Sequence, residues 1–316
     1  MRKTTLLSAV ALSLFLATAS SAQVTEQMAK QGWSMEQGRM PEWHLAQHEK
    51  LSKALSKIAP QRKGIVDAYV VVIGLDSDPV FKKETAEVFK VLQRRFGATT
   101  RSIRLAAGSG TDETDAPQGS PPNLAITLAA IAAKMDMDED VLVFYSTSHG
   151  SKELGLVYRD GEEGFGVIAP KRLKLLFDEL NFKRRVLLLS ACYSGAFVRE
   201  LANDDSVIVT AASSSRPSFG CTPGNDWTFF GDALINNAMR KAQPIAKAVA
   251  EATGLIALWE AKLGLEPSNP QVSIGAARLA PSGTMKAVSF SSGPAVHQPP
   301  SSQPNAANAR DRKSVV

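Results

Sequence analysis

The chain has 316 residues, of which 44% are hydrophobic and 21% charged, and its formal net charge is +5. These values are ordinary for a globular protein and allow one large α/β domain or two small ones. Lys and Arg are interspersed with acidic residues and form no basic stripe, so nucleic-acid binding is not expected. The two cysteines, Cys192 and Cys221, are too few for a disulfide-dense scaffold, and the fold must rest on a hydrophobic core.

Residues 1–22 have the pattern of a secretory signal peptide. Arg2 and Lys3 are followed by a short apolar run over 6–17, and small residues end at Ala22. The run is shorter than the roughly 20 residues of a membrane-spanning helix. We therefore expect a periplasmic or secreted protein without stable membrane insertion after cleavage, and an uncleaved N-terminal anchor is the alternative. The net charge falls to about +3 without Arg2 and Lys3.

Residues 23–63 form a mixed polar segment with scattered apolar residues, which predicts one or two helices on the outside of the main domain. His44 and His48 are four residues apart and would share a helix face. No HExxH pattern accompanies them, so they are interpreted as part of a solvated face. The sequence predicts neither a metal site nor a cofactor.

Residues 64–280 alternate between buried-strand and helix patterns, which predicts a three-layer α/β/α sandwich with a mostly parallel sheet of about six strands. Strands are expected at 68–75, 100–105, 141–145, 186–189, 207–212 and 271–274. Helices are expected at 82–96, 123–135, 171–180, 194–202, 229–242 and 245–263, and a long loop at 108–122. Residues 281–316 are rich in Ser, Pro, Gln, Asn and Ala and are expected to be a disordered tail.

Two of the apolar runs end in reactive residues. The run that begins at Val141 ends in His149-Gly150, and the run that begins at Val186 ends in Ala191-Cys192. Ligands bind at the carboxyl ends of the strands in open α/β sheets. If these two strands are neighbours, His149 and Cys192 face one crevice.

A cysteine and a histidine at such an edge can perform nucleophilic catalysis. The imidazole takes the thiol proton, the thiolate attacks a carbonyl, and a helix that starts near Ser194 would favour the thiolate. The N–H groups of Gly150 and Cys192 are predicted oxyanion donors. The alternatives are a buried structural cysteine and a Cys192–Cys221 disulfide.

These motifs resemble the legumain (asparaginyl endopeptidase) family of cysteine peptidases, and among them the bacterial members. The family pattern is an apolar strand ending in His-Gly and, some forty residues later, another ending in Ala-Cys-x-Ser-Gly. Here the His and the Cys are 43 positions apart. The stretch Ser218-Phe219-Gly220-Cys221 and the pair Gly231-Asp232 extend the resemblance. It implies a caspase-like fold and peptide or protein substrates.

The resemblance also implies a pocket for the substrate residue before the cut bond, P1, and a preference for Asn or Asp there. Ser218, Asp232 and Tyr193 are the pocket residues that it indicates. The sequence departs from the family at Ser148 and Tyr193, where legumains carry acids, and has no evident pocket Arg in the stretch 78–83. A transpeptidase or ligase that uses the same pair, and an inactive binding protein, remain open alternatives.

Overall fold

The computed structural model describes residues 32–108 and 116–276. Six strands form the main sheet in the order β10-β9-β8-β4-β2-β3, and only β10 runs antiparallel to its neighbour. These strands are β2 (Ala68–Gly74), β3 (Ser102–Ala106), β4 (Val141–Thr147), β8 (Arg185–Ser190), β9 (Ser206–Thr210) and β10 (Gln271–Ile274). The mostly parallel six-stranded sheet that the apolar runs predict is therefore confirmed.

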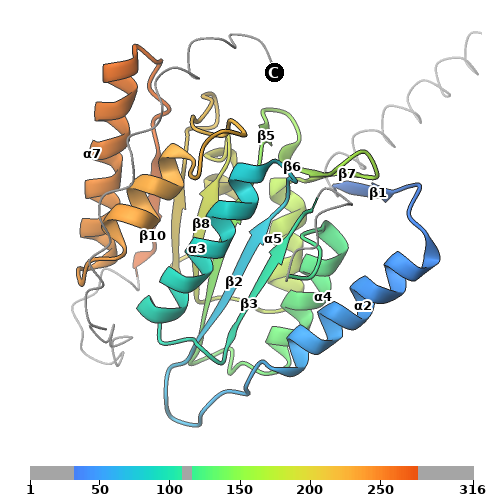
Figure 1. Cartoon of the computed structure of the whole chain (residues 1–316). Helices are drawn as coiled ribbons and strands as arrows, with labels where there is room; N and C mark the ends of the chain where they lie inside the picture. Colours follow the sequence, from blue (N-terminus) through green and yellow to red (C-terminus); the bar gives the residue numbers. More distant parts are fainter. Residues whose placement is uncertain (1–31, 109–115, 277–316) are drawn as a thin grey trace, which may run out of the picture.

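Helices cover both faces of this sheet and make three layers (Figure 1). On one face lie α3 (Pro79–Arg95), the π-helix η1 (Gly231–Ala238) and α7 (Ile245–Leu263). On the other lie α4 (Pro121–Ala132), α5 (Pro170–Glu179) and α6 (Ala196–Leu201), with α2 (Pro41–Ser56) packed outside α4. Successive side chains of each strand enter opposite cores, so a strand buried on both faces needs a continuous apolar run.

The strand run Tyr69 to Ile73 illustrates this alternation. Val70 and Val72 pack into the core under α3, while Tyr69, Val71 and Ile73 pack into the core under α4. All five side chains are fully buried. Burial of side chains of this size contributes about 1.5–3 kcal/mol each, which makes the central strands the rigid base of the site.

A second sheet of four antiparallel strands was not predicted. Its order is β1-β7-β6-β5, with β1 (Trp33–Glu36), β5 (Gly150–Ser151), β6 (Gly155–Asp160) and β7 (Gly164–Ile168). β1 lies in the segment for which only helices were expected. The pair Asp160-Gly161 between two short alternating runs is a hairpin signal that could have located β6 and β7.

The helix expected over residues 229–242 is also different from the prediction, because residues 231–238 form a π-helix. Met239 N–H donates to Leu234 O, five residues back, at 2.8 Å. The side-chain amide of Asn237 donates to the Asp232 carbonyl at 2.9 Å. A side chain that binds the backbone in this way competes with regular α-helical pairing.

No described helix is long and apolar enough to cross a bilayer.

Candidate active site

The register of β4 and β8 brings His149 and Cys192 to the same level of the sheet. Thr147 pairs with Ser190 in this parallel ladder, and each reactive residue follows its strand by two positions. Beyond the ladder, Ser148 N–H donates to Ser190 O at 3.1 Å. The structure therefore places the backbones of both residues side by side at the carboxyl edge, as the sequence predicts.

Gly150 packs directly on the backbone of Cys192. A Cβ atom at position 150 would lie 2.0 Å from Cys192 O and 3.1 Å from Cys192 N. A side chain there would collide with backbone that cannot give way easily, so the close approach requires glycine. The two N–H groups predicted to bind an oxyanion thus belong to residues in contact with each other.

The sulfur of Cys192 lies beside Ser218. Ser218 N–H donates to Sγ at 3.2 Å, and the Ser218 hydroxyl lies 3.6 Å from Sγ. Donors that point at sulfur stabilise a negative charge on it. The sequence predicts a helix that starts near Ser194 and favours the Cys192 thiolate. In the structure α6 starts only at Ala196, so this helix should stabilise the thiolate less than predicted. The resemblance predicts Ser218 as a pocket residue, and the structure adds its contact with Cys192.

Tyr193 turns the chain immediately after Cys192. Its φ angle is +58°, in the left-handed region that residues other than Gly adopt rarely. Such a conformation costs about 1–3 kcal/mol and persists where the surroundings enforce it. Here Tyr193 N–H donates to Arg216 O at 2.9 Å. This bond ties the turn at the cysteine to the loop after β9, which also carries Ser218.

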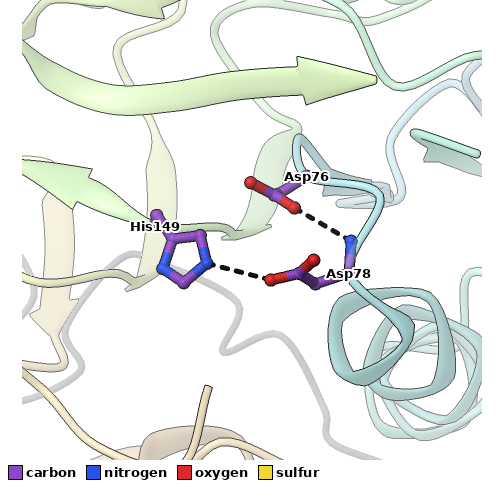
Figure 2. A group of neighbouring side chains, drawn as sticks. All are labelled: Asp76, Asp78 and His149. Carbon is purple, nitrogen blue, oxygen red and sulfur yellow. Dashed lines mark hydrogen bonds and ion pairs between the residues drawn. The ribbon is translucent and has the colours of Figure 1, made fainter. Parts of the chain in front are cut away.

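The imidazole of His149 is held by Asp78, as Figure 2 shows. His149 Nε2 lies 3.2 Å from Asp78 Oδ2, and the ring meets Phe81 edge-on with centroids 5.2 Å apart. The side chains of His149 and Asp78 are 37% and 24% exposed, so both are open to solvent. A carboxylate only accepts hydrogen bonds, so Nε2 carries the hydrogen and Nδ1 remains to accept a proton.

Asp78 was not predicted as a site residue. It precedes Pro79 in the loop between β2 and α3, the stretch in which the legumain resemblance would place a pocket Arg. The signal was present in the sequence, because Asp76 and Asp78 follow a buried strand directly. Parallel strands end at a common edge, which is where such carboxylates meet the residues after β4 and β8.

Asp76, Asp78 and His149 could together bind a metal ion, since one ligand atom from each lies within 4.8 Å of the others. The guanidinium of Arg159 already binds both carboxylates, with Arg159 Nη2 3.1 Å from Asp76 Oδ1 and 2.6 Å from Asp78 Oδ1. Arg159 therefore offsets part of the negative charge that would otherwise attract a metal cation to these oxygens.

Asp232 is buried in the first turn of η1, the position that the resemblance relates to the pocket. Its Oδ1 accepts from the side-chain amides of Asn236 at 2.8 Å and Asn237 at 3.1 Å. These bonds orient the carboxylate within its own helix. A substrate-binding role for Asp232 stays a prediction, as it does for Tyr193.

Cys192 and Cys221 are both free thiols in the structure, so the disulfide alternative is not supported. Burial and, to a smaller extent, the neighbouring Cys192 raise the pKa of the Cys221 thiol to about 12. At neutral pH Cys221 is therefore protonated and unreactive.

A model of the Peptidase C13 family matches residues 127–271, a segment that includes both His149 and Cys192. No curated protein sequence matches this chain. Among solved structures, the crystal structure of caspase-1 from Spodoptera frugiperda is similar with a TM-score of 0.46 and 12% sequence identity. The alignment covers 68% of this chain and 92% of that chain. The family match confirms the predicted resemblance of this chain to the legumain family of cysteine peptidases.

Proposed function

We propose that this protein is an exported cysteine endopeptidase with Cys192 as nucleophile, His149 as general base and Asp78 as the residue that orients His149. One observation carries the proposal: the β4–β8 register places Cys192 beside His149 and seats Gly150 on the Cys192 backbone. The family match supports peptidase chemistry and a peptide or protein substrate.

The reaction begins with transfer of the Cys192 proton to His149 Nδ1, because Nε2 is engaged by Asp78. The thiolate attacks the scissile carbonyl, and the N–H groups of Gly150 and Cys192 stabilise the oxyanion. The imidazolium then protonates the leaving amine, which leaves a thioester on Cys192. Water, deprotonated by His149, hydrolyses the thioester and restores the free thiol.

A preference for Asn or Asp at P1 is part of the proposal and derives from the resemblance. Ser218, which the resemblance assigns to the P1 pocket, supports this preference because its hydroxyl lies 3.6 Å from Cys192 Sγ. Cleavage of a peptide library by the protein from residue 23 onward reports this preference directly. The export part of the proposal derives from residues 1–22, which lie outside the described residues.

Variants of the catalytic pair test the proposal. Cys192→Ala removes the nucleophile and His149→Ala removes the base, so each is expected to lower peptide cleavage by roughly 10³-fold or more. Circular dichroism and thermal unfolding should show that both variants remain folded. The matched control is Cys221→Ala, which removes the other thiol and should keep cleavage. Wild-type cleavage by Cys192→Ala would refute the proposal.

A further inference from the structure

Arg159 on β6 holds both carboxylates of the loop between β2 and α3. Its Nη2 atom donates to Asp78 Oδ1 at 2.6 Å and to Asp76 Oδ1 at 3.1 Å, and its Nε donates to Asp76 Oδ2 at 3.2 Å. The second oxygen of Asp78 faces His149 Nε2 at 3.2 Å. Asp78 is thus divided between the two side chains, with one oxygen toward each.

Asp76 fixes this arrangement from the buried side of the loop. Its side chain is fully buried, and its Oδ1 also accepts the backbone N–H of Asp78 at 2.9 Å (Figure 2). Asp76 therefore orients the backbone of Asp78 and the guanidinium of Arg159 at once. Charge-assisted bonds of this bidentate kind are stronger and more directional than neutral ones.

Backbone hydrogen bonds of β6 also connect the loop between β2 and α3 with the end of β4. Val157 N–H donates to His149 O at 3.0 Å, and Arg159 N–H donates to Leu75 O at 2.9 Å. Ser77 N–H in turn donates to Arg159 O at 2.9 Å. One short strand thus sets the position of the loop that carries Asp78 and of the strand end that carries His149.

We propose that Arg159, oriented by Asp76, is a positioning residue that fixes Asp78 Oδ2 against His149. This inference rests on the proposed peptidase function. Arg159 acts through Asp78 and takes no part in bond making. A guanidinium suits this task because its planar fork binds two carboxylates in one fixed geometry, which an ammonium cannot do.

The other charged groups at this edge differ from Arg159 in their contacts. Lys82 of α3 and Glu162 of the β6–β7 turn line a cavity of about 290 Å³ next to Asp78, together with Arg159. Cys221, from the loop after β9, is protonated at neutral pH because burial raises its pKa to about 12. Among the described contacts, the direct ion pairs of Asp78 are those with His149 and Arg159.

The test measures how fast iodoacetamide alkylates Cys192 as a function of pH, with the labelled residue identified by mass spectrometry. In Arg159→Gln, Asp78 is no longer fixed against His149 and stabilises the imidazolium less. A less stable imidazolium in turn stabilises the Cys192 thiolate less, so the profile should move to higher pH. The same variant should lower kcat for a peptide about tenfold or more, with KM changed less than about threefold.

Two further variants separate charge from geometry. Arg159→Lys keeps the charge and loses the fork, so it should move the midpoint in the same direction as Arg159→Gln and also lower kcat. The matched control is Lys152→Gln, which removes one positive charge from an exposed residue of the β5–β6 turn. This control should match the wild type in both measurements.

A wild-type alkylation midpoint in Arg159→Gln would overturn the inference, and so would an equal shift in Lys152→Gln. If Arg159→Gln does not fold, Arg159→Lys decides, because wild-type kcat in that variant contradicts a role for the fork. Alkylation needs no turnover. A wild type that is alkylated but cleaves no peptide would therefore refute the proposed function, while the midpoints would still decide the inference.

Discussion

The proposed chemistry of the site depends on three residues. The sequence indicates His149 and Cys192, and it does not indicate Asp78. His149 and Cys192 stand out in the sequence because each ends an apolar run and the two motifs together resemble those of the legumain family. Asp78 could not be assigned to the site as easily, because carboxylates are common in loops. Its proposed role depends on a contact with His149, 71 positions away in the sequence. Contacts of that kind depend on tertiary structure.

Asp78→Asn tests the orienting carboxylate. The amide can present a donor to His149 Nε2, which favours the wrong tautomer and removes the charge that stabilises the imidazolium. We expect kcat to fall by about 10²-fold or more with a small change in KM, as measured by steady-state peptide cleavage. The matched control is Asp226→Asn, an exposed carboxylate paired with Lys83, which should keep wild-type kcat. Full activity of Asp78→Asn would remove Asp78 from the mechanism.

At the scale of elements, the proposed site depends on the packing of strand β5 against the residues after β8, where Gly150 contacts the backbone of Cys192. The apolar runs predict the β4 and β8 strands well because a doubly buried strand has few other solutions. They do not predict β5, which has two residues and is defined by its pairing with β6. The close approach of Gly150 to Cys192 accompanies this pairing, which residue-by-residue strand propensity does not predict.

Gly150→Ala tests this fit. The added Cβ would lie 2.0 Å from Cys192 O, so the two segments must separate and the oxyanion donors must move. We expect cleavage to fall by about 10²-fold or more. Gly254→Ala, on α7 where no atom lies within 4 Å of the new Cβ, is the matched control. It should keep activity and raise stability by about 0.5–1 kcal/mol. Equal activity of the two variants would contradict the proposed geometry.

For the whole molecule, the three-layer architecture could be predicted from the order and length of the apolar runs. Two features could not be predicted in full. In the antiparallel sheet β1-β7-β6-β5, Asp160-Gly161 indicates the β6–β7 hairpin, but the pairing of β7 with β1 from the N-terminal segment is non-local. The π-helix η1 depends on local bonds of Asn237 and on the close approach of Gly231 to the buried Glu84. Both features lie beside the site, where local pattern rules often fail.

Glu84 joins three elements in the core below the site and makes overall stability depend on pH. It is fully buried, with Tyr145 OH 2.5 Å from Oε1 and Thr228 N–H 2.7 Å from Oε2. Burial raises the pKa of Glu84 above its ordinary value. The folded protein therefore holds this proton at a pH at which the unfolded chain releases it. The contribution of Glu84 to stability is complete below the unfolded pKa and is lost as pH rises toward the folded one.

Glu84→Gln removes this dependence because the amide is neutral at every pH. The free energy of unfolding, measured with urea at pH 5 and pH 8, should fall less with pH in the variant than in the wild type. The matched control is Glu87→Gln on the same helix. A hydrogen bond with Lys90 lowers the pKa of Glu87, so its stability contribution is already complete at pH 5. The control should follow the wild type, and equal slopes for Glu84→Gln would contradict a protonated Glu84.

The central claim is that Cys192 carries the acyl group during peptide cleavage. The most direct measurement is mass spectrometry of the rapidly acid-quenched enzyme during turnover of a good peptide substrate, followed by mapping of the adduct. The predicted result is a thioester of the N-terminal product fragment on Cys192, absent in Cys192→Ala and present in Cys221→Ala. An acyl group on another residue, or cleavage at the wild-type rate in Cys192→Ala, would contradict the claim.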